Sequence, residues 1–384
     1  MLSLSEYILL FAVFLVLAFL YHRMEEKHQR EEEQDKYAAI RKYLLQDRSL
    51  LENAKQPILW IHVPHEYNAR HWSSFGSRSS LDLNQPYLLL TLQSILRRCA
   101  DSFHVCIVDD TSFAKLLPSW DIDLSILSAP VVTKMRYLGI TKLLHTYGGL
   151  WTPLSFVCFR DLHELYMRHT ADDDKLFVVE NVNRHASSAY ESFCPDPSFL
   201  GCSRGSGAME AFHRFLQTVG STDNTAASAF LGRMSEWCRE RQREGQVTVV
   251  DGKLVGTKTN ANRPLLLEDL MSSQPLDVCP QAYGLWVPAH EILSRRHYEW
   301  FARLSTSQAL EANTALSQYL LLAQCPEGAC RLEEPMSGPG GGGGGGSRPP
   351  WVGFWKVASG APVWGVQPLN QGDETVRRIP YPDN

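Results

Sequence analysis

The amino-acid sequence predicts an α/β fold, and three observations lead to this prediction. Apolar runs of strand length alternate with amphipathic runs of helical period between residues 57 and 332. Two of the apolar runs end in acidic side chains, at Asp109-Asp110 and at Glu180, where a parallel α/β sheet collects its ligands. The composition, with 44% hydrophobic and 21% charged residues over 384 positions, allows a sizeable buried core.

The expected elements follow in order along this domain. Strands are expected over residues 58–63, 103–110 and 175–183, and another is expected to begin at Leu150. Helices are expected over residues 85–100, 133–147, 207–220 and 225–241, with the last helices between 295 and 325. Gly148-Gly149 ends the helix over 133–147, because glycine readily takes the left-handed conformation of a helix cap. A hairpin is expected over 245–256 around Asp251-Gly252.

The segment before this domain predicts a membrane anchor and a stalk. Tyr7 to Tyr21 is an uncharged apolar run, and we expect residues 1–22 to be a retained single-pass anchor in contact with membrane lipid. A cleaved signal peptide is the alternative, but no Lys or Arg precedes the run and no small-x-small site follows it. Basic residues follow the run, which by the positive-inside rule places the bulk of the chain in the cytoplasm; the lumen of the Golgi or ER is the alternative. Residues 23–56 read as a charged helical stalk, either solvated or paired in a short coiled-coil dimer.

The segment after the domain is of low complexity. Residues 333–350 contain seven consecutive glycines and read as a flexible linker. Residues 351–384 form a tail with three tryptophans that either docks back on the domain or binds a partner. The net charge of −5 does not favour nucleic acid as a partner. Nine scattered cysteines without a CxxC pair favour buried free thiols over a zinc site.

The acidic strand ends are the first candidates for chemistry. Asp109 and Asp110 can hydrogen-bond a ribose or hold a metal. The alternative is that Asp110, Thr111 and Ser112 cap the following helix, and the two roles can coexist with one carboxylate for each. Glu180, Asn181 and Asn183 follow the next buried strand and are candidates for the acceptor side of a site. His62 and His65 flank Pro64 at the end of the first strand, where a loop role in hydrogen bonding is the simpler interpretation.

The order of these segments resembles a known family. The runs "ILWIHV", "QPYLLLTLQSIL", "CIVDD" and "LGITKLLHTYGGLW", over roughly residues 57–215, are similar to glycosyltransferases with a sugar-binding DxD region and to capsular-polysaccharide-synthesis transferases. The stretch "WIHVPHEYNARHWSSFGSRSSLDLNQPYLLLTLQSI", residues 60–95, also resembles uncharacterised membrane proteins of large DNA viruses of algae. The resemblance implies a GT-A fold, a nucleotide-sugar donor, a glycan acceptor and a Mn²⁺ or Mg²⁺ cofactor. Gly148, Gly149 and Trp151 fall on the family's turn and aromatic positions.

The sequence departs from this family where the metal binds. The two metal-binding acids fall on Pro153 and Ser155, and neither offers the anionic oxygen that a hard divalent ion requires. An expected Asp–Arg pair falls on Tyr137 and Ile140, and Arg136 lies one helical turn before Ile140. The sequence therefore predicts that Mn²⁺ or Mg²⁺ is not used.

A metal-free transferase needs other positive charge for the leaving diphosphate. The candidates are Arg70, Arg78, Arg136, Lys134 and Lys142. The leading hypothesis is a membrane-anchored, glycosyltransferase-like protein that binds a nucleotide-sugar near Asp109, Asp110, Gly148 and Gly149. The alternative from another class is an inactive GT-A fold with a structural or glycan-binding role in a membrane or virion.

A second motif offers a different enzyme class. "GCSRG", with Ser203 at its centre, matches the G-x-S-x-G elbow of serine hydrolases. Acids and histidines follow in the required order at Asp223, Asp251, His290 and His297. The preceding "CPDPSFL" contains Pro195 and Pro197, which we expect to exclude a central strand there. The hydrolase is therefore the weakest of the three hypotheses.

Overall fold

The fold is described here from a computed structural model of the chain. The structure describes residues 19–21, 23–24, 56–64, 85–117, 120–127, 131–172, 174–184, 192–222 and 227–324. The chain divides into two units, residues 1–46 and 47–384. The first unit contributes only the helical residues 19–21 and 23–24 to this description. The predictions for the stalk, the glycine linker and the tryptophan tail fall outside the described residues, as does most of the predicted anchor.

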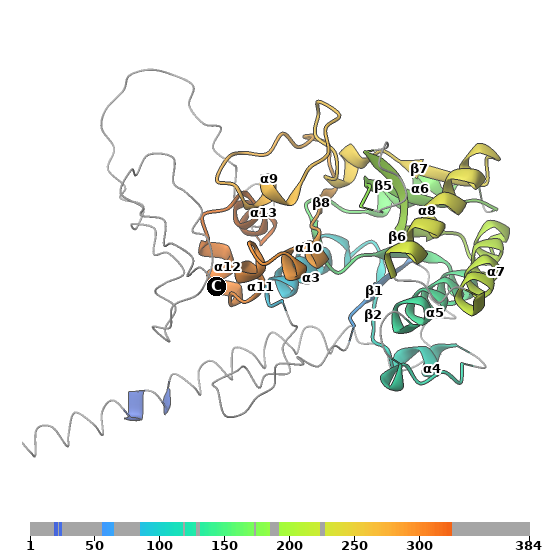
Figure 1. Ribbon diagram of the computed structural model, residues 1–384, viewed down its shortest axis with the longest axis horizontal. Coiled ribbons are helices and arrows are strands. Elements are labelled where there is room, and N and C mark those ends of the chain that lie inside the picture. Colours follow the sequence, from blue (N-terminus) through green and yellow to red (C-terminus); the bar gives the residue numbers. More distant parts are fainter. Residues whose placement is uncertain are drawn as a thin grey trace, which may run out of the picture. The chain divides into compact units, whose positions relative to one another are not determined.

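The second unit is a mixed α/β fold (Figure 1). Its strands are β1 (Ile58–His62), β2 (His104–Val108), β3 (Gly149–Thr152), β4 (Phe156–Cys158), β5 (Leu176–Val182), β6 (Phe193–Cys202), β7 (Val247–Val250) and β8 (Gly284–Trp286). Its longer helices are α3 (Tyr87–Cys99), α5 (Val131–Tyr147), α7 (Gly207–Thr222), α8 (Ala227–Arg243) and α13 (Ala315–Gln324). The shorter ones are α4 (Ser112–Leu116), α6 (His163–His169), α9 (Leu267–Met271), α10 (Ala289–Ser294), α11 (Glu299–Ala302) and α12 (Thr306–Glu311), with 3₁₀ turns η1 (Leu124–Ile126) and η2 (Gly252–Val255).

Six strands form one sheet in the order β2-β1-β3-β6-β5-β7. Strands β2, β1 and β3 run parallel to one another, β6 runs antiparallel to both β3 and β5, and β7 runs parallel to β5. The central strands carry continuous apolar runs, and all five residues of β1 are buried. Such runs are typical of strands that are covered on both faces. The expected α/β class is therefore confirmed.

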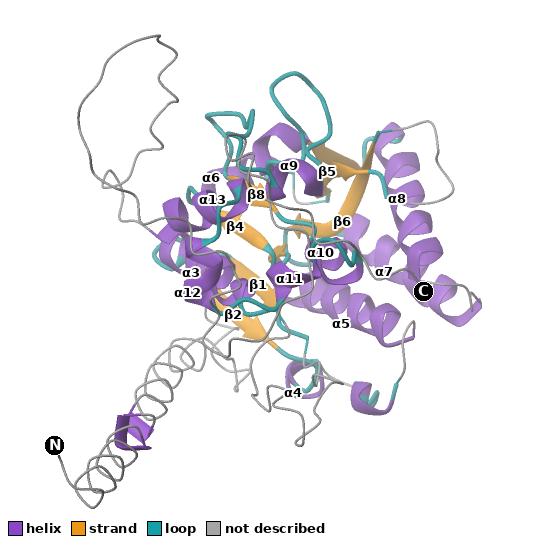
Figure 2. Cartoon of the chain, turned by 60° about the vertical axis from the view of Figure 1, so that its left-hand side comes forward, coloured by secondary structure: helices purple, strands orange, loops and turns teal. Residues whose placement is uncertain are grey.

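Helices flank the sheet in two groups (Figure 2). In one group α5 packs against α7, and α8 packs against β6 and β7. In the other, α3 contacts β4, α12 and α13. The large buried side chains of the core include Trp60, Phe156, Phe177 and Phe199, which belong to strands. Among the described residues, no helix combines the length and apolar character needed to cross a bilayer.

Three expectations about the elements need correction. The hairpin over 245–256 is wrong: β7 is a single strand beside β5, and Asp251 accepts a hydrogen bond from the Lys253 amide to start η2. The strand expected from Leu150 is two strands, since the chain turns at residues 153–155 and β4 then pairs with β8 in a second sheet. The third correction concerns the two prolines of β6.

Pro195 and Pro197 do not exclude a strand. Strand β6 runs from Phe193 to Cys202, but only residues 200–202 pair with β3. The prolines lie beyond that central part, and the β5–β6 register shifts between Val178 and Val179, so that residues 197–199 are passed over. A bulge tolerates proline because it leaves backbone groups outside the ladder. The prediction failed because it treated the whole run as central.

Candidate functional site at the ends of the parallel strands

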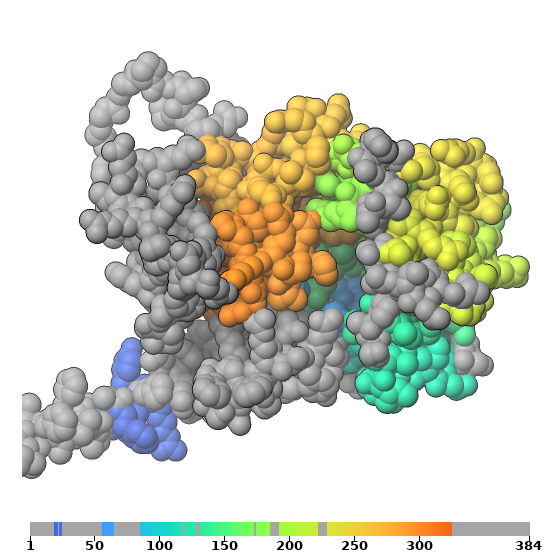
Figure 3. Space-filling model, in the orientation of Figure 1, coloured from blue at the N-terminus to red at the C-terminus, as the bar shows by residue number. Residues whose placement is uncertain are grey.

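Strands β1, β2 and β3 end at the same edge of the sheet. In the register, His62 is the partner of Val108 and Ile61 is the partner of Thr152. The residues that follow β2 are Asp109 and Asp110, so the polar ends of all three strands are brought together. Figure 3 shows a hollow in the surface between the orange C-terminal helices and the green and teal segments, with blue atoms of the β1 region at its base.

Asp110 is the centre of a compact polar cluster at this edge. Its Oδ1 accepts hydrogen bonds from His62 Nε2 at 2.9 Å and from Arg136 Nε at 3.0 Å, and its Oδ2 accepts one from the second guanidinium arm at 2.8 Å. The side chains of Asp110 and Arg136 are 13% and 16% exposed. His62 also stacks on Phe113 with ring centroids 5.6 Å apart. The cluster therefore joins β1, β2 and α5 in a mostly buried setting.

These partners keep Asp110 ionised. Burial alone would raise the pKa of this carboxyl, but the hydrogen bonds from His62 and Arg136, together with their charges, hold its pKa well below the ordinary range. The sequence identified Asp110 and Arg136 as candidates separately. It gave no sign that they would pair, since 26 positions separate them.

Asp109 has a different task from Asp110. Its Oδ1 accepts hydrogen bonds from the Ser112 amide at 2.8 Å, the Ser112 hydroxyl at 2.7 Å and the Thr111 hydroxyl at 2.8 Å. These bonds organise the start of α4 and lower the pKa of Asp109, although its burial acts in the opposite direction. The contact with the start of α4 that was expected of Asp110 is made by Asp109 instead, and Asp110 is held toward Arg136.

Gly148 and Gly149 lie where only glycine fits. Both have positive φ, at +72° and +108°. A Cβ on Gly148 would lie 2.7 Å from the Arg204 amide nitrogen, and a Cβ on Gly149 would lie 2.2 Å from the Ile58 carbonyl oxygen. The Gly148 carbonyl accepts a hydrogen bond from Trp60 Nε1 at 2.9 Å. The two glycines thus allow α5 to end and β3 to pack directly against β1 and β6.

Trp151 on β3 packs against Tyr137 on α5. Trp151 is buried, and its ring meets Tyr137 edge-on with centroids 5.3 Å apart. The Tyr137 hydroxyl lies 2.6 Å from Ser198 Oγ. Asp196 accepts a hydrogen bond from the Ser198 amide at 2.9 Å, and burial together with the Asp196 charge raises the pKa of Tyr137. Sequence reasoning missed Ser198 and Asp196, because their strand was not expected.

The turn after β3 contains Pro153 and Ser155, the two positions where the sequence resemblance would place metal-binding acids. The Leu154 carbonyl accepts a hydrogen bond from Thr91 Oγ1 at 2.5 Å, and the Ser155 carbonyl accepts one from the Val287 amide at 3.2 Å. Thr152 is fully buried, and its hydroxyl has no hydrogen-bond partner in the structure described. Among the described residues, no three His, Cys, Asp or Glu side chains gather as metal ligands would. The turn is tied to its surroundings through its backbone.

The residues expected on the acceptor side lie along the end of β5. Glu180 pairs with Lys258, whose ammonium also lies over the Phe193 ring at 4.5 Å. Asn181 Nδ2 donates to Asp196 Oδ2 at 2.8 Å, while the Asn183 amide donates to the Ser192 carbonyl at 2.9 Å. Glu180 is thus turned toward β7 and η2, and Asn181 toward Asp196.

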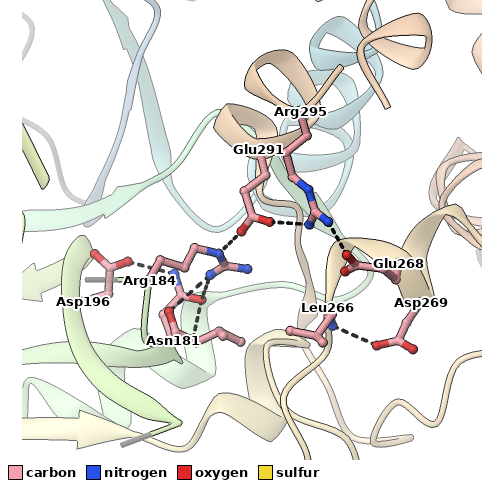
Figure 4. A network of polar contacts seen from close by, with 9 residues as sticks. Asn181, Arg184, Asp196, Leu266, Glu268, Asp269, Glu291 and Arg295 are labelled. Atoms are coloured by element: carbon pink, nitrogen blue, oxygen red, sulfur yellow. Dashed lines mark hydrogen bonds and ion pairs between the residues drawn. The ribbon is translucent and has the colours of Figure 1, made fainter. Parts of the chain in front are cut away.

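A series of hydrogen bonds and ion pairs continues from Asn181 to the C-terminal helices (Figure 4). Arg184 donates to Asn181 Oδ1 at 3.2 Å and also pairs with Glu291 on α10. Glu291 pairs in turn with Arg295, and Arg295 pairs with Glu268 on α9. These contacts join the end of β5 to α10 and α9. They could not be predicted from sequence, since Arg184 and Glu291 are 107 positions apart.

The other two cation candidates that the structure describes, Lys134 and Lys142, also lie on α5. Lys134 is buried on α5, with its ammonium 5.7 Å from the centre of the Phe230 ring. Lys142 lies two helical turns further along α5, near His213. Arg70, Arg78 and His65 lie outside the described residues. Arg136 is therefore the candidate cation that the structure brings to Asp110.

The G-x-S-x-G segment lacks the contacts of a nucleophile. Ser203 donates to the Thr170 carbonyl at 3.4 Å, and in the described part of the chain it hydrogen-bonds no histidine. Asp251 is engaged by the Lys253 amide and Lys258, and Asp223 lies outside the described residues. Strand β6, which leads into the motif, is antiparallel to both neighbours.

Comparisons with known proteins give weak likenesses. No family model and no curated protein matches the chain. Among solved structures, two of the glycosyltransferase GlyE from Streptococcus pneumoniae TIGR4 are similar, with 10% and 11% identity, a TM-score of 0.31, and 52% of this chain and 46% of theirs covered. The chain thus spans less than half of the GlyE length. The galactosyltransferase LgtC, in complex with donor and acceptor sugar analogues, is similar with 10% identity and a TM-score of 0.33, covering 70% of this chain and 98% of that one. At these TM-scores the likeness identifies neither family nor activity.

Proposed function

We propose that the chain is a glycosyltransferase-like protein of GT-A type that binds a nucleotide-sugar at the edge where β1, β2 and β3 end. The observation that carries the proposal is the Asp110–Arg136 pair, an ionised carboxylate and a guanidinium held together at the carboxyl ends of parallel strands. A carboxylate accepts hydrogen bonds from ribose hydroxyls or a base, and a guanidinium matches a diphosphate. The Asn181–Asp196 pair supplies polar groups for a glycan acceptor beyond Trp151.

We propose further that this binding needs no divalent ion. Pro153 offers no side-chain ligand, Ser155 offers only a hydroxyl, and the hydroxyl of Thr152 at the end of β3 is fully buried. The charge of the diphosphate would then be met by Arg136. The second candidate function is binding without turnover, which the same absence of carboxylates from the turn favours.

The test is a titration of the full-length protein in detergent with UDP, GDP, CMP and their common sugar conjugates. Asp110→Asn keeps the side-chain shape and removes the charge, and we expect it to weaken binding about tenfold or more, as the loss of a charged hydrogen bond does. Asp123→Asn is the matched control, because Asp123 is an exposed carboxylate that caps η1. Circular dichroism checks that both variants are folded.

The outcomes separate the candidates. Equal affinity in EDTA and in Mn²⁺ supports metal-free binding, whereas affinity that appears only with Mn²⁺ contradicts it. Binding accompanied by transfer of the sugar to an acceptor, with release of the nucleotide into solution, supports an enzyme, and binding without transfer supports the inactive alternative. A folded wild-type protein that binds none of these nucleotides ends the proposal.

We also propose that residues 7–21 anchor the chain in a membrane with the α/β domain on the cytoplasmic side. The proposal rests on the uncharged run and the basic residues that follow it. Protease protection in sealed membranes tests the orientation, and a protected α/β domain would place it in the lumen instead.

A further inference from the structure

Two buried thiols face each other between α3 and β4. Cys99 is the last residue of α3 and Cys158 is the last residue of β4. Both are 0% exposed, and their sulfur atoms lie 3.9 Å apart. Neither residue belongs to the polar cluster at the strand ends, so the pair is independent of the proposed function.

Hydrogen bonds already hold the two elements that carry these thiols. Ser94 on α3 accepts a hydrogen bond from the Cys158 amide at 2.8 Å, and Thr91 donates to the Leu154 carbonyl at 2.5 Å. The Cys158 thiol also donates to the Arg160 carbonyl at 3.0 Å. Because the backbone is fixed on both sides, the sulfur–sulfur approach follows from the packing of α3 on β4.

The other buried cysteines differ in this respect. The thiol of Cys106 donates to the His104 carbonyl at 3.7 Å, and that of Cys202 to the Leu144 carbonyl at 3.6 Å. In the described residues, no second pair of cysteine sulfurs lies within hydrogen-bonding distance. Cys106 is equally buried, at 0% exposure, and so provides a matched comparison for Cys99.

We propose that Cys99 and Cys158 close to a disulfide, tying α3 to β4, when the chain folds in the presence of a disulfide oxidant. The S–S bond forms as each thiol loses its proton and the pair loses two electrons. A small-molecule or protein disulfide accepts the electrons and protons and is reduced to two thiols. The sulfurs must approach by about 2 Å to reach bonding distance, a movement that side-chain rotation begins.

Burial sets the moment at which the bond forms. The thiolate is the reactive species, and burial, followed by the contact with Cys99, raises the pKa of the Cys158 thiol. The folded, reduced chain therefore reacts slowly, and the disulfide forms while the chain folds. The state of the pair consequently records the redox conditions of the compartment in which folding took place: reduced in the cytosol and bonded in an oxidising lumen.

The test refolds the full-length chain from denaturant in mixed oxidised and reduced glutathione, or in reduced glutathione alone. After alkylation, trypsin places Cys99 and Cys106 together in residues 99–115 and Cys158 in residues 143–160. We expect these two peptides to be linked only after oxidative refolding, and to separate on reduction. The link is expected to vanish in Cys99→Ala and to persist in Cys106→Ala.

Two further measurements need no variant. The oxidised wild-type protein is expected to unfold at higher urea concentration than the reduced one. The folded, reduced protein is expected to form the link more slowly in the same glutathione mixture than the refolding chain does, and equal rates would contradict the folding-coupled route. A folded wild-type chain without the linked peptides, or a link that survives in Cys99→Ala, overturns the proposal.

Discussion

Removing the Arg136 charge tests whether the polar cluster at the strand ends is a strongly coupled unit. Arg136→Met keeps much of the side-chain length but leaves Asp110 with His62 as its remaining described partner. Loss of one partner of a fully buried pair costs about 3–5 kcal/mol. The two side chains are 16% and 13% exposed, which lowers the expected loss in the free energy of unfolding to about 2–3 kcal/mol.

A double-mutant cycle separates this pair from the other contacts of Arg136. Combining Arg136→Met with Asp110→Asn is expected to give a coupling energy of about 2 kcal/mol, measured by urea unfolding of the full-length protein followed by circular dichroism. The control cycle uses Arg168 and Glu164, whose side chains are 59% and 60% exposed. Its coupling is expected to stay below about 0.5 kcal/mol. A coupling for Asp110 and Arg136 as small as that of the control refutes the reasoning.

The pH dependence gives an independent check with a definite sign. The folded pKa of Asp110 lies below its ordinary value of about 3.9, so its stabilising contribution is fully present above that value. The contribution is lost as the pH falls from about 4 towards the lower folded pKa. Arg136→Met should therefore lose less stability than the wild type between neutral and acid pH. An unchanged acid dependence would show that Arg136 does not hold the pKa of Asp110.

Three further predictions concern single sites near this edge and on α7. Thr152→Val is expected to raise the free energy of unfolding by about 1 kcal/mol in the urea assay, because it removes a buried hydroxyl that has no partner in the described structure. Thr91→Val should lower it by about 1 kcal/mol, because the equally buried Thr91 hydroxyl donates to the Leu154 carbonyl. Gly149→Ala should lower the free energy of unfolding by well over about 2 kcal/mol, because its Cβ would meet the Ile58 carbonyl oxygen. Gly205→Ala, also at positive φ but with open space around the Cβ, should lower it by about 1 kcal/mol. Similar losses for the two variants would mean that the positive φ alone sets the cost. Burial lowers the pKa of His213 to about 4, so stability should fall as the pH drops from about 6.5 towards 4, and His213→Gln should remove that part of the pH profile measured by thermal unfolding.

The sequence predicted the elements whose pattern is local. The end of α5 at Gly148-Gly149 is set by backbone conformation and close approach, which glycine alone satisfies. The runs that form β1, α3 and β2 carry their own period and burial, so their positions followed from sequence. Asp109 and Asp110 were recognised as a pair of acids at a strand end. The sequence did not show that Asp109 would contact Ser112 and that Asp110 would contact Arg136.

What the sequence could not predict depends on contacts between distant segments. The register shift between β5 and β6 leaves Pro197 outside the ladder, and it depends on strand pairing that no local pattern shows. Asp196 therefore remained unnoticed, although it accepts hydrogen bonds from Asn181 and Ser198. The link from Arg184 to Glu291 arises in the same way, from the packing of the C-terminal helices near the end of β5.

The turn after β3, residues 153–155, carries no charged side chain. Its backbone is fixed by Thr91 and by Val287, its Leu154 side chain is buried, and Ser155 is 8% exposed. A carboxylate placed there would be desolvated without a cation to offset the cost, so the turn serves packing between α3 and β8. Asp110, by contrast, is held ionised by Arg136 and His62 where β1 and β2 end. These strand ends therefore carry a paired carboxylate and guanidinium, from the segment after β2 and from α5, whereas the Thr152 hydroxyl at the end of β3 is buried.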